Sequence, residues 1–261
     1  MEQTLEQKRN RLFIILAGIF ITNTLLAEIL GAKIFSAEAT VGLHPANLSI
    51  LGFTMDFNLT AGVVIWPAVF ITTDLVNEYF GKPGVKRISY LTAILIAYAF
   101  VVIFLTIHLP PADWWISAYS KDAQGNTLNI DYAFGKIFGQ GQRIIIASLT
   151  AFLIGQLVDV FVFHKLRNIT GSKYLWLRST GSTLVSQFVD SFVVLYIAFS
   201  GTFSNKQIVA IGITNYIYKF VVAILLTPLI YFGHSLIDRY LGKENADQIS
   251  TEAAGQSKGF F

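Results

Sequence analysis

The sequence contains no cysteine, and only 13% of its 261 residues are charged. Without cysteine there are no disulfide bonds, no thiolate metal sites and no cysteine nucleophile. The low charged fraction, together with 54% hydrophobic residues and a mean hydropathy of +0.57, argues against a soluble domain. The net charge of +3 forms no continuous basic stripe, so a nucleic-acid partner is not expected. We therefore expect a protein that contacts membrane lipid.

Long apolar runs occupy most of the chain. A transmembrane helix needs about 20 mostly apolar residues. Six segments meet this requirement, at roughly 12–32, 59–80, 86–109, 142–164, 178–200 and 206–233. The first run follows basic residues but lacks the small-residue cleavage site of a signal peptide, so we interpret it as a span. The sequence predicts an all-α integral membrane protein, with a single six-helix transmembrane domain over residues 1–242.

Lysine and arginine gather in alternate connections between these spans. They occur before the first span, around residues 82–87 and 165–178, and after residue 233. The positive-inside rule places these connections, and with them both termini, in the cytoplasm. Residues 243–261 are polar and show no apolar period, which predicts a disordered cytoplasmic tail.

The two longest connections lie on the opposite side. In the first, Phe53, Met55, Phe57 and Leu59 alternate with polar residues, a period of two that predicts a short extended or hairpin element. The second, residues 110–141, is rich in Trp and Tyr, which prefer the headgroup level of a membrane. We expect it at the outer interface, either covering a pocket or resting on lipid.

The fifth span carries a row of polar side chains. Arg178, Ser182, Ser186 and Asp190 recur every four residues, so they share one helix face, with Gln187 beside them. A charged residue at bilayer depth costs about 2.5–3.5 kcal/mol on insertion scales, so this face turns away from lipid. The row predicts a polar path through the bundle.

The fourth span repeats part of this pattern. Gln156 and Asp159 have the same spacing as Gln187 and Asp190, and an aromatic residue follows each pair. Two such pairs on adjacent spans predict facing elements of one cavity. All four residues are candidate substrate contacts.

The second span ends in a polar cluster of Asp74, Asn77 and Glu78, which share a face near the cytoplasmic surface. Two carboxylates this close disfavour simultaneous ionisation unless a cation lies between them. Arg178 enters the membrane from the same side and is the expected cation. The contact is either a structural clamp between two helices or a gate that opens during transport.

Three further polar residues lie deep in the spans. Asn23 is near the middle of the first span, and Asn215 and Lys219 are near the middle of the sixth. Lys219 is at the same depth as Asp190, so we expect either a permanent ion pair or one that substrate or a proton opens. Glu28 lies near the outer end of the first span, and we expect its side chain to extend from there to water.

No enzyme motif is present. The sequence has no phosphate-binding glycine loop, no zinc-binding HExxH pattern and no intramembrane pairing of Ser or Cys with His. We therefore expect a protein that is not an enzyme and needs no cofactor or metal.

Three segments of the chain resemble a known family. They are residues 71–82, residues 155–163, and residues 178–190 together with 197–201. The family they resemble is the queuosine precursor transporter family, also called the vitamin uptake transporter family. The resemblance extends over about residues 12–235, and Asn77 departs from the expected small residue. It implies a multi-pass protein of the bacterial inner membrane that imports 7-deazaguanine bases such as preQ0 and preQ1 for tRNA modification. It also implies a fold similar to the substrate-binding subunits of energy-coupling-factor transporters.

A deazapurine base suits the polar residues found above. Its edge offers N–H donors to carboxylates and acceptors to amides, and its face suits aromatic stacking. The residues expected to bind it are Asn23, Trp66, Gln156, Asp159, Gln187, Asp190, Asn215 and Lys219, with Phe188 and Tyr216 as further stacking surfaces.

Two functions remain open at this point. One is a standalone importer, driven by protons or working by facilitated diffusion. The alternative is a substrate-capture subunit of an ATP-driven uptake complex for vitamins or nucleobases. The particular base, and whether the chain forms a homo-oligomer, stay open as well.

Overall fold

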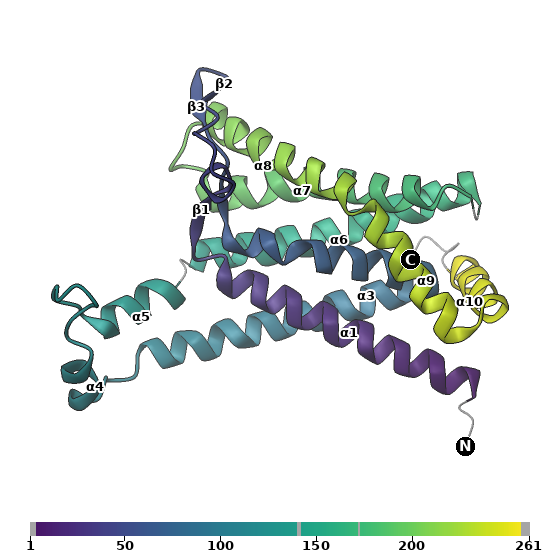
Figure 1. Cartoon of the computed structure of the whole chain (residues 1–261), viewed down its shortest axis with the longest axis horizontal. Coiled ribbons are helices and arrows are strands. Elements are labelled where there is room, and N and C mark those ends of the chain that lie inside the picture. Colours follow the sequence, from purple (N-terminus) through teal and green to yellow (C-terminus); the bar gives the residue numbers. More distant parts are fainter. Residues whose placement is uncertain (1–3, 140–141, 172, 257–261) are drawn as a thin grey trace.

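A computed structural model describes residues 4–139, 142–171 and 173–256 of the chain. The described residues include five helices that are long and apolar enough to cross a membrane. They are α1 (Leu5–Leu30), α3 (Trp66–Ile107), α6 (Gln142–Thr170), α7 (Leu175–Phe199) and α8 (Asn205–Leu225). These helices lie side by side in a bundle (Figure 1), which confirms the prediction of an all-α membrane protein.

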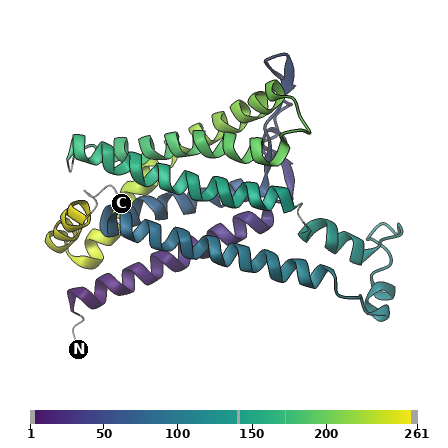
Figure 2. The same cartoon turned by 180° about the vertical axis from the view of Figure 1, so that it is seen from behind.

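Helix α3 consists of two arms that run in opposite directions (Figure 2). The backbone leaves helical geometry at Gly81, where φ is 63° and ψ is −168°, and Pro83 follows. Glycine adopts this conformation readily because it has no Cβ, and proline lacks the N–H that an uninterrupted helix needs. The two arms occupy the places of the spans predicted at 59–80 and 86–109. The start of α1, the Gly81 turn and the end of α9 (Thr227–Leu241) lie at one end of the bundle, called here the inner end.

The predicted span at 59–80 begins too early. Strand β4 (Asn58–Thr60) and a 3₁₀ turn, η1 (Ala61–Val64), precede the helix, which starts at Trp66 with Pro67 in its first turn. Gly62 makes this arrangement possible because its backbone lies against α1. A Cβ atom on Gly62 would lie 2.3 Å from the carbonyl oxygen of Ala27.

The predicted span at 206–233 is also divided. Helix α8 ends at Leu225, and α9 begins at Thr227 with Pro228 in its first turn. Proline has no N–H to bond the preceding turn, so a new helix starts there.

Two short antiparallel ribbons cover the opposite, outer end of the bundle (Figure 1). Strand β1 (Ile34–Ser36) pairs with β4, β2 (Leu48–Ile50) pairs with β3 (Phe53–Met55), and the short helix α2 (Ala37–Thr40) lies between β1 and β2. Leu51 and Gly52 have φ values of 53° and 88°, as the two-residue type I′ hairpin turn requires. The predicted hairpin element is confirmed.

The second outer connection forms helices α4 (Asp113–Ala118) and α5 (Ile130–Phe138), which project from the outer end. Trp114 and Tyr132 are exposed there. Their placement at the lipid interface stays a prediction.

The prediction of a disordered tail is wrong for residues 243–256, which form helix α10 (Lys243–Gln256); residues 257–261 lie outside the described residues. Ala246, Ile249 and Ala253 are buried, and α10 lies against α3. These three residues recur every three to four positions, a short apolar stripe within a polar stretch. Docking against α3 stabilises a helix that the polar composition alone disfavours.

Candidate functional site

A buried carboxylate, Asp159 of α6, connects three helices at the centre of the bundle. Asn77 Nδ2 of α3 donates a hydrogen bond of 3.1 Å to Asp159 Oδ2. Ser186 Oγ of α7 lies 3.3 Å from Asp159 Oδ1. The polar row predicted on the fifth span therefore faces the bundle interior at this depth.

Asp74 lies one turn before Asn77 on α3 and is also buried. The hydroxyl of Ser179 donates a hydrogen bond to Asp74 Oδ2, whereas Asp74 Oδ1 has no hydrogen-bond partner among the described residues. Sequence reasoning did not single out Ser179. Its position next to Arg178, in a polar turn of the predicted fifth span, could have identified it.

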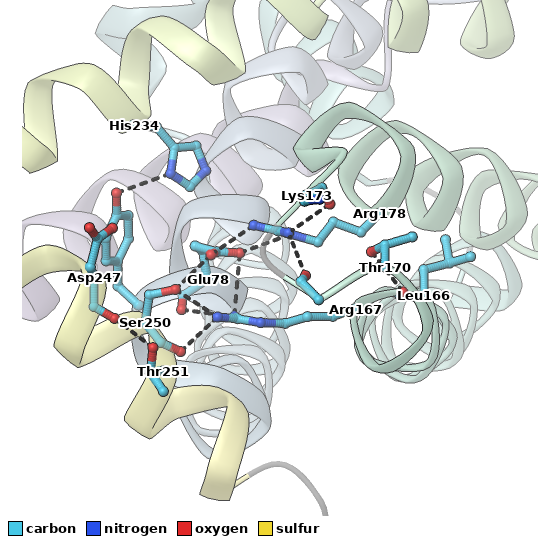
Figure 3. A network of polar contacts seen from close by, with 12 residues as sticks. Glu78, Leu166, Arg167, Thr170, Lys173, Arg178, His234, Asp247, Ser250 and Thr251 are labelled. Atoms are coloured by element: carbon cyan, nitrogen blue, oxygen red, sulfur yellow. Dashed lines mark hydrogen bonds and ion pairs between the residues drawn. The ribbon is translucent and has the colours of Figure 1, made fainter.

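Glu78 binds Arg178 in a bidentate ion pair near the inner end (Figure 3). Arg178 Nη2 lies 2.8 Å from Glu78 Oε1, and Arg178 Nε lies 3.1 Å from Glu78 Oε2. Two parallel charge-assisted hydrogen bonds fix both distance and orientation. The expected contact between the second and fifth spans is confirmed, with Glu78 rather than Asp74 as the carboxylate in contact with arginine.

Two residues that sequence reasoning missed complete this cluster (Figure 3). Arg167 Nη1 lies 3.4 Å from Glu78 Oε2, and Arg167 Nη2 donates to Ser250 Oγ of α10 at 2.6 Å. Ser250 Oγ in turn donates to Glu78 Oε1 at 2.7 Å. The four residues Glu78, Arg167, Arg178 and Ser250 are called the inner cluster below.

Arg167 had a signal in the sequence, although it was counted only as a basic residue of a connection. It continues the buried stripe of Gln156, Val160 and Phe163 on α6, at positions i, i+4, i+7 and i+11. Ser250 had no such signal, because its segment is polar and was predicted to be disordered.

A second ion pair lies nearer the outer end. Lys219 Nζ of α8 is 2.5 Å from Asp190 Oδ2 of α7, as the matching depths of the two residues predicted. Asp190 also lies close to α6, because a Cβ atom on Gly155 would be 3.6 Å from Asp190 Cβ. Asp190 and Asp159 therefore both lie at the interface between α6 and α7.

Glu28 does not extend to water, which corrects the sequence-based expectation. It is 9% exposed, and Ser148 Oγ of α6 donates a 2.6 Å hydrogen bond to Glu28 Oε2. The reason is its place on the buried face of α1, next to Ala27 and one turn after Thr24.

The other predicted substrate contacts are not gathered into one open cavity. Asn23 Nδ2 bonds Ile19 of its own helix at 2.8 Å, and Gln187 is half-buried. Gln156 faces the second arm of α3, where its Oε1 has no partner among the described residues. Asn215 lines a separate outer cavity of about 240 Å³ beneath β3.

Trp66 and Lys219 line a common hollow, with Phe70 stacked on Trp66 at 5.9 Å between ring centroids. Its volume is about 10 Å³, whereas small-molecule pockets are about 300–1,000 Å³. The proposed stacking surface of Phe188 and Tyr216 is an edge-on pair at 5.3 Å, with Phe188 exposed. The bundle is closed around these residues in this conformation.

The chain is similar to known transporters over most of its length. A family model described as “Putative vitamin uptake transporter” matches residues 60–233. The chain is 32% identical to the “Probable queuosine precursor transporter” of Bacillus subtilis over 196 residues, which cover 74% of this chain and 80% of that protein. It is 29% identical to the “Probable queuosine precursor transporter” of Haemophilus influenzae, with 69% of this chain and 71% of that protein covered.

A third relative, the “Queuosine precursor transporter” of Escherichia coli, is 29% identical over 184 residues, which cover 68% of this chain and 72% of that protein. No solved structure matches the fold. The family match includes the inner residues Glu78, Arg167 and Arg178, as well as Asp159 and the Asp190–Lys219 pair. The chain belongs to the queuosine precursor transporter family, also called the vitamin uptake transporter family.

Proposed function

We propose that the protein imports 7-deazaguanine queuosine precursors, such as preQ0 and preQ1, across the bacterial inner membrane for tRNA modification. The names of its three relatives support the substrate class. The observation that carries the proposal is a series of buried and partly buried polar contacts along α3, α6, α7 and α8. It runs from the inner cluster through Asp74 and Asp159 to Asp190 and Lys219.

The chemistry of this series suits a guanine-like base. The carboxylates of Asp159 and Asp190 can accept hydrogen bonds from adjacent N–H groups of the base. Amide side chains can bind the carbonyl and ring-nitrogen acceptors of the base. We therefore keep eight residues as proposed substrate contacts: Asn23, Trp66, Gln156, Asp159, Gln187, Asp190, Asn215 and Lys219.

We propose that the two arms of α3 cross the membrane separately, which makes six crossings. The inner end then faces the cytoplasm, because Lys and Arg concentrate in its connections. The start of α1 and the end of α9 both lie on that side. Similarity to the substrate-binding subunits of energy-coupling-factor transporters is part of the proposal and rests on the sequence resemblance.

Import through this closed bundle requires opening at each end in turn. The inner cluster joins α3, α6, α7 and α10, and the Asp190–Lys219 pair joins α7 and α8. We propose that these contacts are the two gates, and that a base replaces Lys219 as the partner of Asp190.

Uptake by the purified protein in liposomes tests the proposal. Radiolabelled preQ1 is expected to accumulate inside and to be recovered unchanged, with preQ0 competing better than guanine. Asp190→Asn should abolish uptake, whereas Asp113→Asn on the exposed helix α4 should not. An inward proton gradient separates proton-driven import from facilitated diffusion.

Binding without uptake would instead favour a capture subunit that needs an ATP-driven partner. Absence of both binding and uptake would refute the assignment of the substrate.

A further inference from the structure

A cavity of about 410 Å³ opens at the inner end, away from the polar path. It lies between the start of α1 and the turn of α3. The lining residues are Arg9, Asn10 and Phe13 of α1 and Phe80, Pro83, Gly84 and Arg87 of α3.

The base of this cavity is aromatic. The rings of Phe13 and Phe80 are 5.0 Å apart, and the Arg9 guanidinium lies 5.9 Å from the centre of the Phe80 ring. Gly84 allows Phe80 to lie here, because a Cβ atom on Gly84 would lie 2.5 Å from Phe80 Cβ.

The rim of the cavity is basic. No carboxylate is among its lining residues, and Arg87 is exposed with no ion-pair partner in the described part of the chain. Arg9 contacts Glu252 at 3.6 Å, but the Glu252 side chain is 45% exposed. Such exposed pairs contribute little, so Arg9 is available to a stronger anionic ligand.

Two arginines that line one cavity suit a phosphate group, which arginine binds through its planar array of donors. The neighbouring surface indicates where the rest of the ligand lies. Ile14 of α1 and Leu91 and Ile94 of α3 are exposed, one to two turns further into the apolar part of the helices. A lipid whose phosphate occupied the cavity would lay its acyl chains along these side chains.

We propose that this cavity binds the phosphate group of an anionic phospholipid between α1 and α3. Basic pockets between membrane helices on the cytoplasmic side bind such headgroups through the negative charge of the lipid. The site is separate from the proposed substrate path, and it does not depend on which base is transported.

Native mass spectrometry of the detergent-solubilised protein, with phosphatidylglycerol or phosphatidylcholine added, tests the site. Wild type should bind phosphatidylglycerol more tightly. The double variant Arg9→Gln with Arg87→Gln should weaken this binding about 30-fold, which corresponds to about 2 kcal/mol. Arg11→Gln is the matched control, because Arg11 is exposed on the same end of α1 and does not line the cavity.

If the double variant does not fold, Arg87→Gln alone should still weaken phosphatidylglycerol binding about fivefold, since Arg87 is exposed. Equal losses in Arg11→Gln would mean that general surface charge attracts the lipid and would overturn the proposal. So would unchanged binding in the Arg9 and Arg87 variants. Displacement of the lipid by an equal concentration of glycerol 3-phosphate or inorganic phosphate would assign the cavity to a soluble phosphate instead. None of these outcomes depends on transport.

Discussion

Lys219 Nζ lies 2.5 Å from Asp190 Oδ2, and this ion pair joins α8 to α7 inside the apolar part of the bundle. The two side chains are only 18% and 21% exposed. Each charge compensates the other where neither is stable in lipid alone. The pair therefore holds α7 and α8 together in this conformation.

Lys219→Met should destabilise the protein by about 2.5–3.5 kcal/mol, because it leaves the Asp190 carboxylate without a cation at membrane depth. Adding Asp190→Asn should restore much of the stability but not substrate binding, since the carboxylate is then absent. Thermal unfolding of the single and double variants measures this coupling. Strictly additive losses would mean that the two charges act independently.

Arg178→Ala should cost about 3–5 kcal/mol, the typical effect of removing one partner of a buried ion pair. Arg167 lies 3.4 Å from Glu78 and keeps one cation near it, which places the expected loss at the lower end of that range. Unfolding in a denaturant series measures the effect. Arg239→Ala, at an exposed position of α9, is the control, and an equal change in both variants would contradict the inner cluster.

Ser250→Ala should loosen α10, because the hydroxyl connects Arg167 at 2.6 Å with Glu78 at 2.7 Å. Hydrogen bonds to charged groups contribute about 1.5–3 kcal/mol each, so hydrogen exchange in α10 should become faster. Thr251→Ala removes an exposed hydroxyl that bonds only the α10 backbone at Asp247. This neighbouring variant should exchange like wild type; if the two variants behave alike, Ser250 does not hold the helix.

Low pH should loosen the outer ribbons through Glu38. Its carboxylate accepts hydrogen bonds from Phe57 N at 2.7 Å, Ser36 Oγ at 3.0 Å and Ala46 N at 3.4 Å. The Phe57 N–H holds the pKa of Glu38 below its ordinary value. A lowered folded-state pKa gives stability that is present above the unfolded pKa, about 4.3, and is lost as pH falls through the folded value.

Hydrogen exchange in residues 36–60 should therefore rise, after correction for intrinsic rates, between neutral pH and about pH 3. Glu38→Gln should exchange faster at neutral pH and show a smaller change on acidification. An acid response as large as that of wild type would assign the effect to another carboxyl group.

The sequence by itself determined the membrane class and where its polar residues had to find partners. The sequence predicted that Asp190 meets Lys219, because charges in lipid pair at matching depth. For the same reason it predicted that Arg178 meets the carboxylates of Asp74 and Glu78. The outer hairpin followed from the alternation around Phe53 and Met55, since side chains on a strand point to opposite faces.

Only the tertiary structure decided which groups actually touch. Arg178 binds Glu78 instead of Asp74, and Glu28 faces Ser148. The predicted substrate residues share no common open cavity, since Asn215 lines an outer cavity apart from Trp66 and Lys219. Helix rotation and tilt set these contacts, and the periodicity of a single helix does not encode them. Ser250 meets Glu78 from 172 positions away, because α10 becomes a stable helix only when Ala246 and Ile249 are buried against the rest of the protein.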